Sequence, residues 1–173
     1  WKYATEGGIV ARPTIYDNNV IFGSEDHRLH VVSVRSGKVV WTYYTEGEIY
    51  SSPRIADGHI FFGSDDQDMH AVNVTSGHAN WKFATDAPIH STPLVANEMI
   101  FFGTESGGFY AIDFRGEQKW RFQSKRAVTS SAIIKGQAVY FSSVDGTLYA
   151  LDSKNGWPIW KFRMRKGSTS SPS

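Results

Sequence analysis

Tryptophan recurs in this chain at an almost constant interval, and that interval restricts the fold more than any other feature. Five of the six tryptophans are spaced by 40, 40, 39 and 40 residues, at Trp1, Trp41, Trp81, Trp120 and Trp160. The sequence that follows is repeated as well: WTYYTEGEIYSSPRI from Trp41 returns as WKFATDAPIHSTPLV from Trp81. A fixed period of roughly 20 to 50 residues is typical of chains built from one repeated supersecondary unit.

Each unit has the pattern of short β-strands. The apolar runs VIFGS, IFFGS, IFFGT and VYFSS keep the same phase, as do LHVVS, MHAVN, FYAID and LYALD. Turn residues separate these runs, and no stretch shows a sustained helical period. Four short antiparallel strands in about 40 residues predict one blade of a β-propeller. A sheet this small must stack on its neighbours to bury both faces.

We therefore predict an all-β fold with four blades in a single domain over residues 1–173. A lone D strand is expected at 1–5, blades at about 9–45, 49–85, 89–124 and 128–163, and a further A strand at 168–173. The end strands do not complete one blade, which predicts an excerpt of a longer array or a half-ring that pairs with a second copy. A closed four-bladed ring would leave two terminal strands without partners.

Composition excludes some classes of function. The 18 Lys and Arg residues nearly balance 17 Asp and Glu, for a net charge of +1, so nothing in the overall charge favours nucleic acid as a partner. The chain has no cysteine, which excludes disulfides, thiolate metal sites and Cys nucleophiles. No run approaches the roughly 18 apolar residues of a membrane span. The chain starts at Trp1 without a signal-peptide pattern, so we expect either a removed targeting segment or a piece of a longer protein.

The segment LYALDSKNGWPIW, residues 148–160, resembles the tryptophan-docking repeat of the PQQ-like propellers of the quinoprotein dehydrogenase type, roughly A-x-D-x-x-x-G-K-x-x-W. All four units share this resemblance, although the first has Val31 and Ser33 for Ala and Asp, and the fourth has Trp157 for Lys. The resemblance implies that the indole packs between blades near the glycine turn, and that a full ring has about seven or eight blades. It thus implies structural roles for Trp41, Trp81, Trp120, Trp160, Gly37, Gly77, Gly116 and Gly156.

Two groups of side chains invite a metal interpretation. Asp65, Asp66 and Asp68 lie in DDQD, but the spacing and the terminal Glu of a calcium loop are absent. This segment aligns with the Asp-Gly turn of SVDGT in the fourth unit, which favours a hairpin turn. His30 and His70 share their slot with tyrosines in the later units, which favours packing of an amphipathic ring.

Catalytic motifs are absent from the sequence. It contains no Ser-His-Asp order, P-loop, zincin or nucleotide fingerprint. The resemblance implies that enzymes of the family hold PQQ over a Ca²⁺ ion bound by carboxylate and amide side chains. The inner-strand slots here offer only Ser, Thr, Pro, Leu and Arg. We therefore expect no catalytic residue, metal or cofactor in this chain, unless other blades supply ligands for PQQ and Ca²⁺.

Departures from the repeat are the best candidates for function, because the shared residues already serve the fold. Arg12 replaces a Ser or Thr of the inner-strand slot, and Arg54 lies two positions later in phase. Both are predicted to point into the channel and to bind an anionic group or a partner's carboxylate. Tyr50 and His90 share a variable slot near the channel, which favours a binding role, because loops on rigid scaffolds carry recognition.

The loop after strand D changes its charge along the chain. Its slot holds Glu6, Glu46 and Asp86 in the early units but Lys125 and Arg165 in the late ones, with Arg126, Arg163 and Lys166 nearby. If these loops share one mouth, that mouth is acidic on one side and basic on the other and could orient a protein partner. The alternative is a solvated rim without a specific role.

The combined pattern favours a non-catalytic propeller scaffold for protein interaction or ligand sensing. The resemblance implies a periplasmic or extracellular location, as in the lipoprotein scaffold of outer-membrane β-barrel assembly and the sensor parts of membrane kinases. One alternative is a fragment of a PQQ-dependent dehydrogenase, and another is carbohydrate binding by Tyr43, Tyr44 and Trp157. Expected partners are a protein and a second copy that completes the ring, with neither nucleic acid binding nor membrane insertion.

Overall fold

The computed structural model describes residues 1–164, which form four antiparallel four-stranded sheets, each with its strands in chain order. Blade 1 contains β1 (Thr14–Tyr16), β2 (Asn19–Ser24), β3 (Arg28–Ser33) and β4 (Val39–Tyr44). Blade 2 contains β5 (Arg54–Ala56), β6 (His59–Gly63), β7 (Asp68–Asn73) and β8 (Ala79–Ala84). Blade 3 contains β9 (Leu94–Ala96), β10 (Met99–Gly103), β11 (Gly108–Asp113) and β12 (Gln118–Gln123). Blade 4 contains β13 (Ile133–Lys135), β14 (Ala138–Ser143), β15 (Thr147–Asp152) and β16 (Pro158–Arg163).

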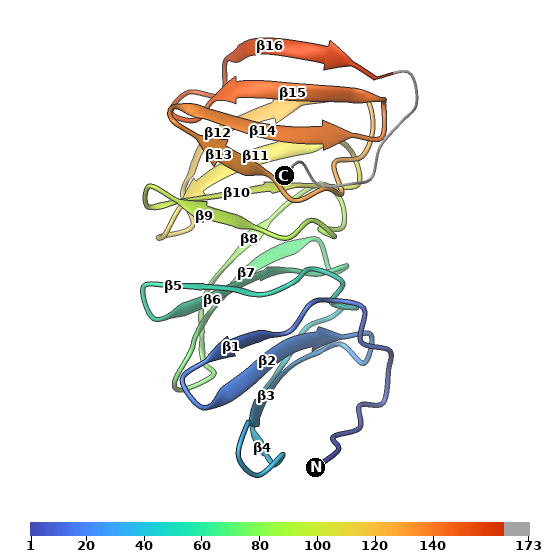
Figure 1. The fold of residues 1–173 in the computed structure, drawn as a ribbon, viewed down its shortest axis with the longest axis vertical. Helices are drawn as coiled ribbons and strands as arrows, with labels where there is room; N and C mark the ends of the chain where they lie inside the picture. Colours follow the sequence, from blue (N-terminus) through green and yellow to red (C-terminus); the bar gives the residue numbers. More distant parts are fainter. Residues whose placement is uncertain (165–173) are drawn as a thin grey trace.

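The four blades form an open arc. Figure 1 shows them stacked along the long axis, with blade 1 and blade 4 at opposite ends. This confirms the predicted all-β propeller architecture. Residues 1–5, for which we expect a D strand, belong to no strand of the structure, and the expected A strand at 168–173 lies outside the described residues. No helix in the described part of the chain is long and apolar enough to cross a membrane.

The hydrophobic core lies between neighbouring blades. In β6, Ile60, Phe61 and Phe62 are all fully buried although they are consecutive. Ile60 and Phe62 pack in one cluster with Ile21 and Leu29 of blade 1, whereas Phe61 packs with residues of blade 3. Because successive side chains of a strand point to opposite faces, the apolar run covers both faces of the sheet.

Each blade is linked to the next by a tryptophan and a glycine. The glycines of the turns before β4, β8, β12 and β16 all have positive φ, and a Cβ on each would overlap an indole of the preceding unit. The pairs are Trp1 with Gly37, Trp41 with Gly77, Trp81 with Gly116, and Trp120 with Gly156. Trp1, which the resemblance left out, therefore docks like the others. Trp160 has no such glycine within residues 1–164 and is 44% exposed.

Candidate functional site

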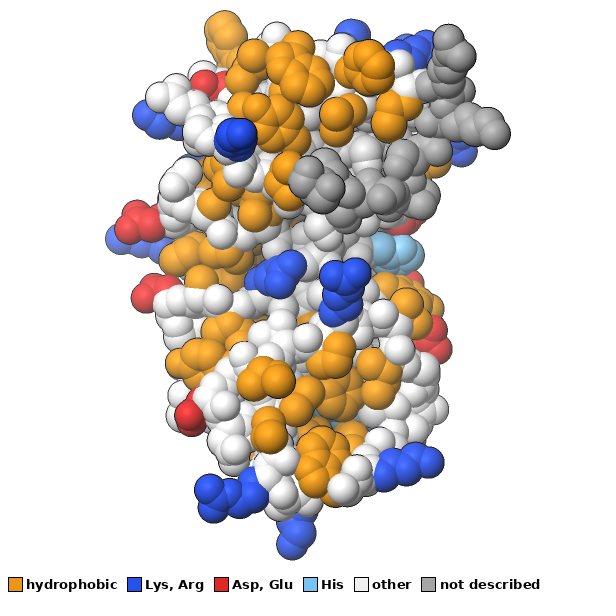
Figure 2. Space-filling view, in the orientation of Figure 1, with side chains coloured by type: hydrophobic (Ala, Val, Ile, Leu, Met, Phe, Trp, Pro, Cys, Tyr) orange, Lys and Arg blue, Asp and Glu red, His pale blue; other side chains and the backbone are white. Residues whose placement is uncertain are grey.

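Segments at or just before the inner strands of all four blades line one cavity of about 560 Å³, here called the axial groove. Its walls are residues 10–14 of blade 1, residues of blades 2 and 3, and residues 131–133 of blade 4. Blade 2 contributes Tyr50, Ser52 and Arg54, so the structure brings Arg12, Arg54 and Tyr50 together in one cavity. In Figure 2, basic side chains lie near the middle of the visible face, between its two apolar areas.

The two arginines of the axial groove have no acidic partner in the described part of the chain. Both side chains are exposed, and no Asp or Glu is among the groove residues. The ion pairs among residues 1–164 use other cations, such as Arg28 and Arg121. A guanidinium without a carboxylate can bind an external carboxylate or phosphate through two parallel hydrogen bonds.

Hydroxyl groups of the repeated Ser, Thr and Pro segment hold the groove walls together. The Arg12 backbone N–H donates to Ser52 Oγ at 2.9 Å, which joins blade 1 to blade 2. The Ser51 hydroxyl donates to the Ser91 carbonyl at 2.9 Å, which joins blade 2 to blade 3. Ser91 in turn bonds both backbone groups of Gly103 in its own blade. These serines are therefore structural, and Ser52 holds the backbone of Arg12 in place.

His90 lies outside the groove lining and bridges two blades at its rim. Its Nε2 is 2.6 Å from Asp65 in blade 2, and its Nδ1 is 2.9 Å from Glu105 in blade 3. The imidazole also meets Tyr50 edge-on, with ring centroids 4.9 Å apart. The imidazole thus faces one carboxylate at each ring nitrogen, one from each of two neighbouring blades. Sequence reasoning singled out His90 but missed both of its acidic partners.

The loops after the D strands lie beside the hairpins between strands B and C. Glu46 donates its backbone N–H to Asp66, and its side chain is exposed. Asp86 accepts hydrogen bonds from Ser106, Tyr110 and Arg121. Burial alone would raise the pKa of Asp86, but these hydrogen bonds and the Arg121 charge hold the pKa below its usual range. Asp86 therefore already has partners within blade 3.

The corresponding loop of blade 4 is basic. The Lys125 backbone donates to Asp145, and the Lys125 side chain lines a cavity of about 240 Å³ with Lys161 and Arg163 of β16. Arg126 is exposed beside Lys125. This loop slot is therefore basic at blade 4 and acidic at the earlier blades. Arg165, the other basic residue of the slot, lies outside the described residues.

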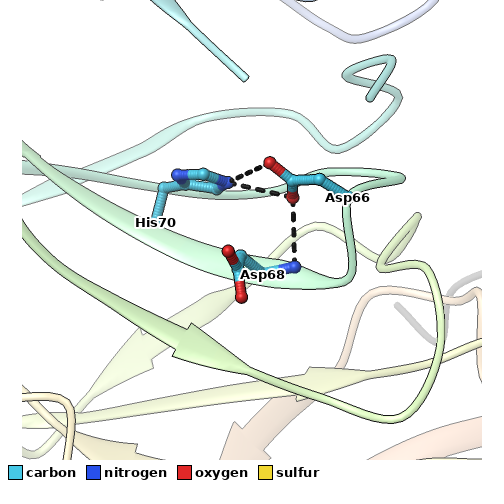
Figure 3. Close-up of side chains that lie close together, drawn as sticks. All are labelled: Asp66, Asp68 and His70. Carbon is cyan, nitrogen blue, oxygen red and sulfur yellow. Dashed lines mark hydrogen bonds and ion pairs between the residues drawn. The ribbon is translucent and has the colours of Figure 1, made fainter. Parts of the chain in front are cut away.

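The acidic hairpin of blade 2 brings Asp66, Asp68 and His70 together, with one potential ligand atom of each within 4.8 Å of the others (Figure 3). Both oxygens of Asp66, however, already accept internal hydrogen bonds. His70 Nε2 donates to both oxygens at 3.1 Å. The backbone N–H groups of Glu46 and Asp68 donate to Asp66 at 3.2 and 3.1 Å. Asp26 and Asp145 accept comparable hydrogen bonds in blades 1 and 4. The arrangement is thus a feature of the repeat that hydrogen bonding explains.

The slot of His30 and His70 is buried and hydrogen-bonded in every blade, which sequence reasoning expected only as packing. In blade 2, Tyr43 of the preceding blade donates to His70 Nδ1 at 3.2 Å, because the bond to Asp66 places the imidazole proton on Nε2. Tyr3 and His30 form the same arrangement with Asp26. In blades 3 and 4 the pairs are Phe83 with Tyr110 and Phe122 with Tyr149, and these tyrosines donate to carboxylates themselves.

Comparisons with known proteins place this geometry in a family. The sequence model described as outer membrane protein assembly factor BamB matches residues 45–172. No curated protein matches the chain. The structure resembles BamB from Moraxella catarrhalis, with a TM-score of 0.76, 20% identity and coverage of 88% of this chain and 48% of that one.

Two further solved structures have the same fold. The computationally designed Ika8 protein has a TM-score of 0.81 at 13% identity, with coverage of 91% of this chain and 50% of that one. The quinohemoprotein alcohol dehydrogenase ADHIIG from Pseudomonas putida HK5 has a TM-score of 0.82 at 15% identity, with coverage of 94% and 35%. The chain therefore spans half or less of the length of these three proteins, and identities this low show the fold alone.

Proposed function

Because the chain belongs to the family of the outer membrane protein assembly factor BamB, we propose that it is a non-catalytic propeller scaffold that binds a protein partner outside the cytoplasm. The observation that carries this proposal is the pair Arg12 and Arg54 in the axial groove, which no acidic residue of the described chain lines. The partner would place a carboxylate between the two guanidinium groups. Tyr50 adds aromatic surface to the same groove.

The enzymatic alternative finds little support in this part of the chain. A quinone bound over Ca²⁺ needs oxygen ligands, which carboxylate and amide side chains supply best. Among residues 1–164, no Asp, Glu, Asn or Gln side chain lines the axial groove. Its residues therefore do not fit this cofactor, and blades outside the chain would have to provide the complete set of ligands.

The structure gives little support to carbohydrate binding, because the three candidate aromatic side chains do not form one continuous surface. Tyr43 is hydrogen-bonded to His70, and Arg28 lies 5.0 Å from the ring centroid of Tyr44. Trp157 is 74% exposed but belongs to blade 4, at the opposite end of the arc from blade 1 (Figure 1). A sugar could therefore contact only one end of this set.

The proposal is tested by photo-cross-linking from within the axial groove in cells of the source organism. A photoreactive residue at Thr92, which lines the groove, should trap one dominant protein, and Arg12→Glu with Arg54→Glu should remove that product. Arg35→Glu and Arg115→Glu, which reverse two exposed charges outside the groove, are the matched control. A product that survives the groove substitutions, or no product from Thr92, would contradict the proposal.

Self-association is a second candidate, favoured by the uncovered outer side of blade 4. Ile159, Trp160 and Phe162 of β16 are 54%, 44% and 62% exposed. Trp160 and Phe162 hold the slots of Trp120 and Phe122, which pack against the following blade. We propose that a second copy covers this surface and extends the arc, as the half-length match to the designed Ika8 chain also supports.

A further inference from the structure

Blade 4 has a basic cavity that is separate from the axial groove. Lys125 enters it from the loop after β12, and Lys161 and Arg163 enter it from β16. Asp145, Thr147 and Tyr149 form the rest of its lining. All three cations are exposed, so an external ligand can reach them.

Two other blades show what normally occupies this place. In blade 3, Asp86 of the loop after the D strand accepts a 2.8 Å ion pair from Arg121, whose guanidinium lies over the Tyr110 ring. In blade 1, Glu6 of the corresponding loop pairs with Arg28 at 3.1 Å. The repeat therefore neutralises the rim cations of these blades with a carboxylate from this loop.

Blade 4 keeps a cation, Lys161, in the slot of Arg121 and lacks this carboxylate. Lys125 occupies the slot of Glu6 and Asp86, so the loop adds a positive charge where the others supply a negative one. None of Lys125, Lys161 and Arg163 forms an ion pair with the described residues, and residues 165–173 contain no Asp or Glu.

Asp145, the one carboxylate that lines the cavity among residues 1–164, already accepts hydrogen bonds within the protein. Asp145 accepts hydrogen bonds from the Tyr149 hydroxyl at 2.8 Å and from the backbone N–H groups of Thr147 and Lys125 at 2.8 and 3.3 Å. Three neighbouring cations with one occupied carboxylate leave an excess of positive charge, and like charges this close favour an anionic ligand.

We propose that this cavity binds carboxylate side chains of an acidic peptide segment, which take the place that Asp86 holds in blade 3. The inference rests on the proposed function insofar as the peptide belongs to a protein partner. It assigns that partner an acidic segment near blade 4, whereas the axial groove needs only a single carboxylate.

The test uses the complete chain and an oligoglutamate peptide, with binding followed by calorimetry and by shifts of the Lys161 and Arg163 amide signals. Lys125→Glu gives blade 4 the loop charge of the earlier units, so it is compatible with the fold. This variant should bind the peptide at least about tenfold more weakly, because it removes one cation and supplies an internal competitor. Lys135→Glu, the same charge change at an exposed residue of β13, should leave the affinity within about twofold.

Three results would overturn the proposal: no binding of oligoglutamate, equal binding by wild type and Lys125→Glu, or an equal loss in Lys135→Glu. Oligoglutamine, inorganic phosphate and vesicles of anionic lipid are run as separate probes. Binding of phosphate or vesicles in place of oligoglutamate would also overturn it, because the site would then serve a different anion.

The design separates this inference from the proposed function. Arg12→Glu with Arg54→Glu should abolish the groove cross-link while oligoglutamate binding by blade 4 persists. If the groove yields no cross-link but the peptide still binds with the expected sensitivity to Lys125→Glu, the proposed function fails and the blade 4 site stands. The opposite pattern removes only the blade 4 site.

Discussion

At the scale of single residues, one buried repeat position is filled by histidine in two blades and by tyrosine in the other two, and each residue type has its own set of hydrogen-bond partners. A histidine at this position accepts from a tyrosine of the preceding blade and donates to an aspartate, as in the set Tyr43, His70 and Asp66. A tyrosine here donates directly to a carboxylate, and the residue of the preceding blade is then phenylalanine, as in Phe122 and Tyr149. The two residues change together because a buried hydroxyl needs a partner.

Replacing the Tyr and His pair of blade 2 by the Phe and Tyr pair of blade 4 tests this coupling. Tyr43→Phe alone leaves His70 Nδ1 without its donor and should lower the free energy of unfolding by about 1 to 2 kcal/mol. His70→Tyr alone places two hydroxyl groups against each other. The double variant reproduces the pair found in blade 4 and should be more stable than the sum of the single effects by about 1 kcal/mol. Strictly additive effects in denaturant titrations would contradict the coupling.

The buried carboxylate of Asp66 makes stability depend on acid pH. Burial alone would raise its pKa, but the hydrogen bond and the electrostatic attraction of His70 and two backbone N–H groups lower the pKa to about 2 from 3.8. A pKa lowered by folding stabilises the native state above the pKa of the unfolded chain. This contribution, about 2 kcal/mol, is lost as pH falls from about 4 towards 2.

Asp66→Asn should therefore destabilise the protein at neutral pH, and the difference from wild type should shrink below pH 4. Denaturant titrations of both proteins across this pH range measure it. Asp68→Asn is the matched control, because burial and the neighbouring Asp66 charge raise the pKa of Asp68. Removing the Asp68 charge should stabilise the protein at neutral pH. A constant difference between Asp66→Asn and wild type down to pH 2 would exclude this account.

At the scale of elements, the D strand of each blade is fastened to the next blade by its indole. The Trp81 Nε1–H donates to the Phe114 carbonyl at 2.8 Å, and the Trp120 Nε1–H donates to the Ser153 carbonyl at 3.0 Å. The ring lies flat against a turn that has no room for a side chain. The glycine is therefore needed both for its positive φ and for the close approach of the indole.

Two glycines of blade 2 separate these two requirements. Gly77 and Gly58 both have φ of +71°, but a Cβ on Gly77 would lie 2.8 Å from Trp41, whereas nothing lies within 4 Å of one on Gly58. Gly58→Ala should cost about 1 kcal/mol from backbone strain alone. Gly77→Ala should cost a further 1 to 3 kcal/mol, roughly, because the indole must move. Equal losses in thermal unfolding would show that the indole contributes nothing.

At the scale of the whole molecule, the arc is stabilised by contacts between neighbouring blades. Blade 2 and blade 3 are each covered on both faces, whereas every residue of β16 is exposed to a substantial extent. In a stack of this kind, stability is close to a sum of blade and interface contributions. The uncovered end is therefore expected to open first.

Hydrogen exchange at low and high protein concentration tests both this expectation and self-association. At low concentration, β16 should exchange faster than β7, which lies inside the arc. At high concentration β16 should become protected if a second copy covers it, while β7 stays unchanged. Phe162→Asp should remove the concentration dependence and keep the rest of the pattern. Exchange of β16 that is independent of concentration would contradict self-association.

The repeat period by itself determined most of the architecture of this protein. Strands, blades, docking glycines and the common location of Arg12 and Arg54 follow from phase, because equivalent positions of a repeat fold into equivalent places. Alignment of the repeats also identified Lys125 as a basic residue in a loop slot that is acidic in the earlier units. Family membership followed from the same residues, since the docking pattern itself is the signature.

Only the tertiary structure decided which side chains meet between blades. His90 lies between Asp65 and Glu105, and Lys125 lies beside Lys161, although these residues belong to different sheets or to distant parts of one unit. Alignment of repeat slots identifies equivalent residues but not the neighbours that stacking brings together. Such contacts depend on how far a side chain reaches across an interface, and that is determined by packing.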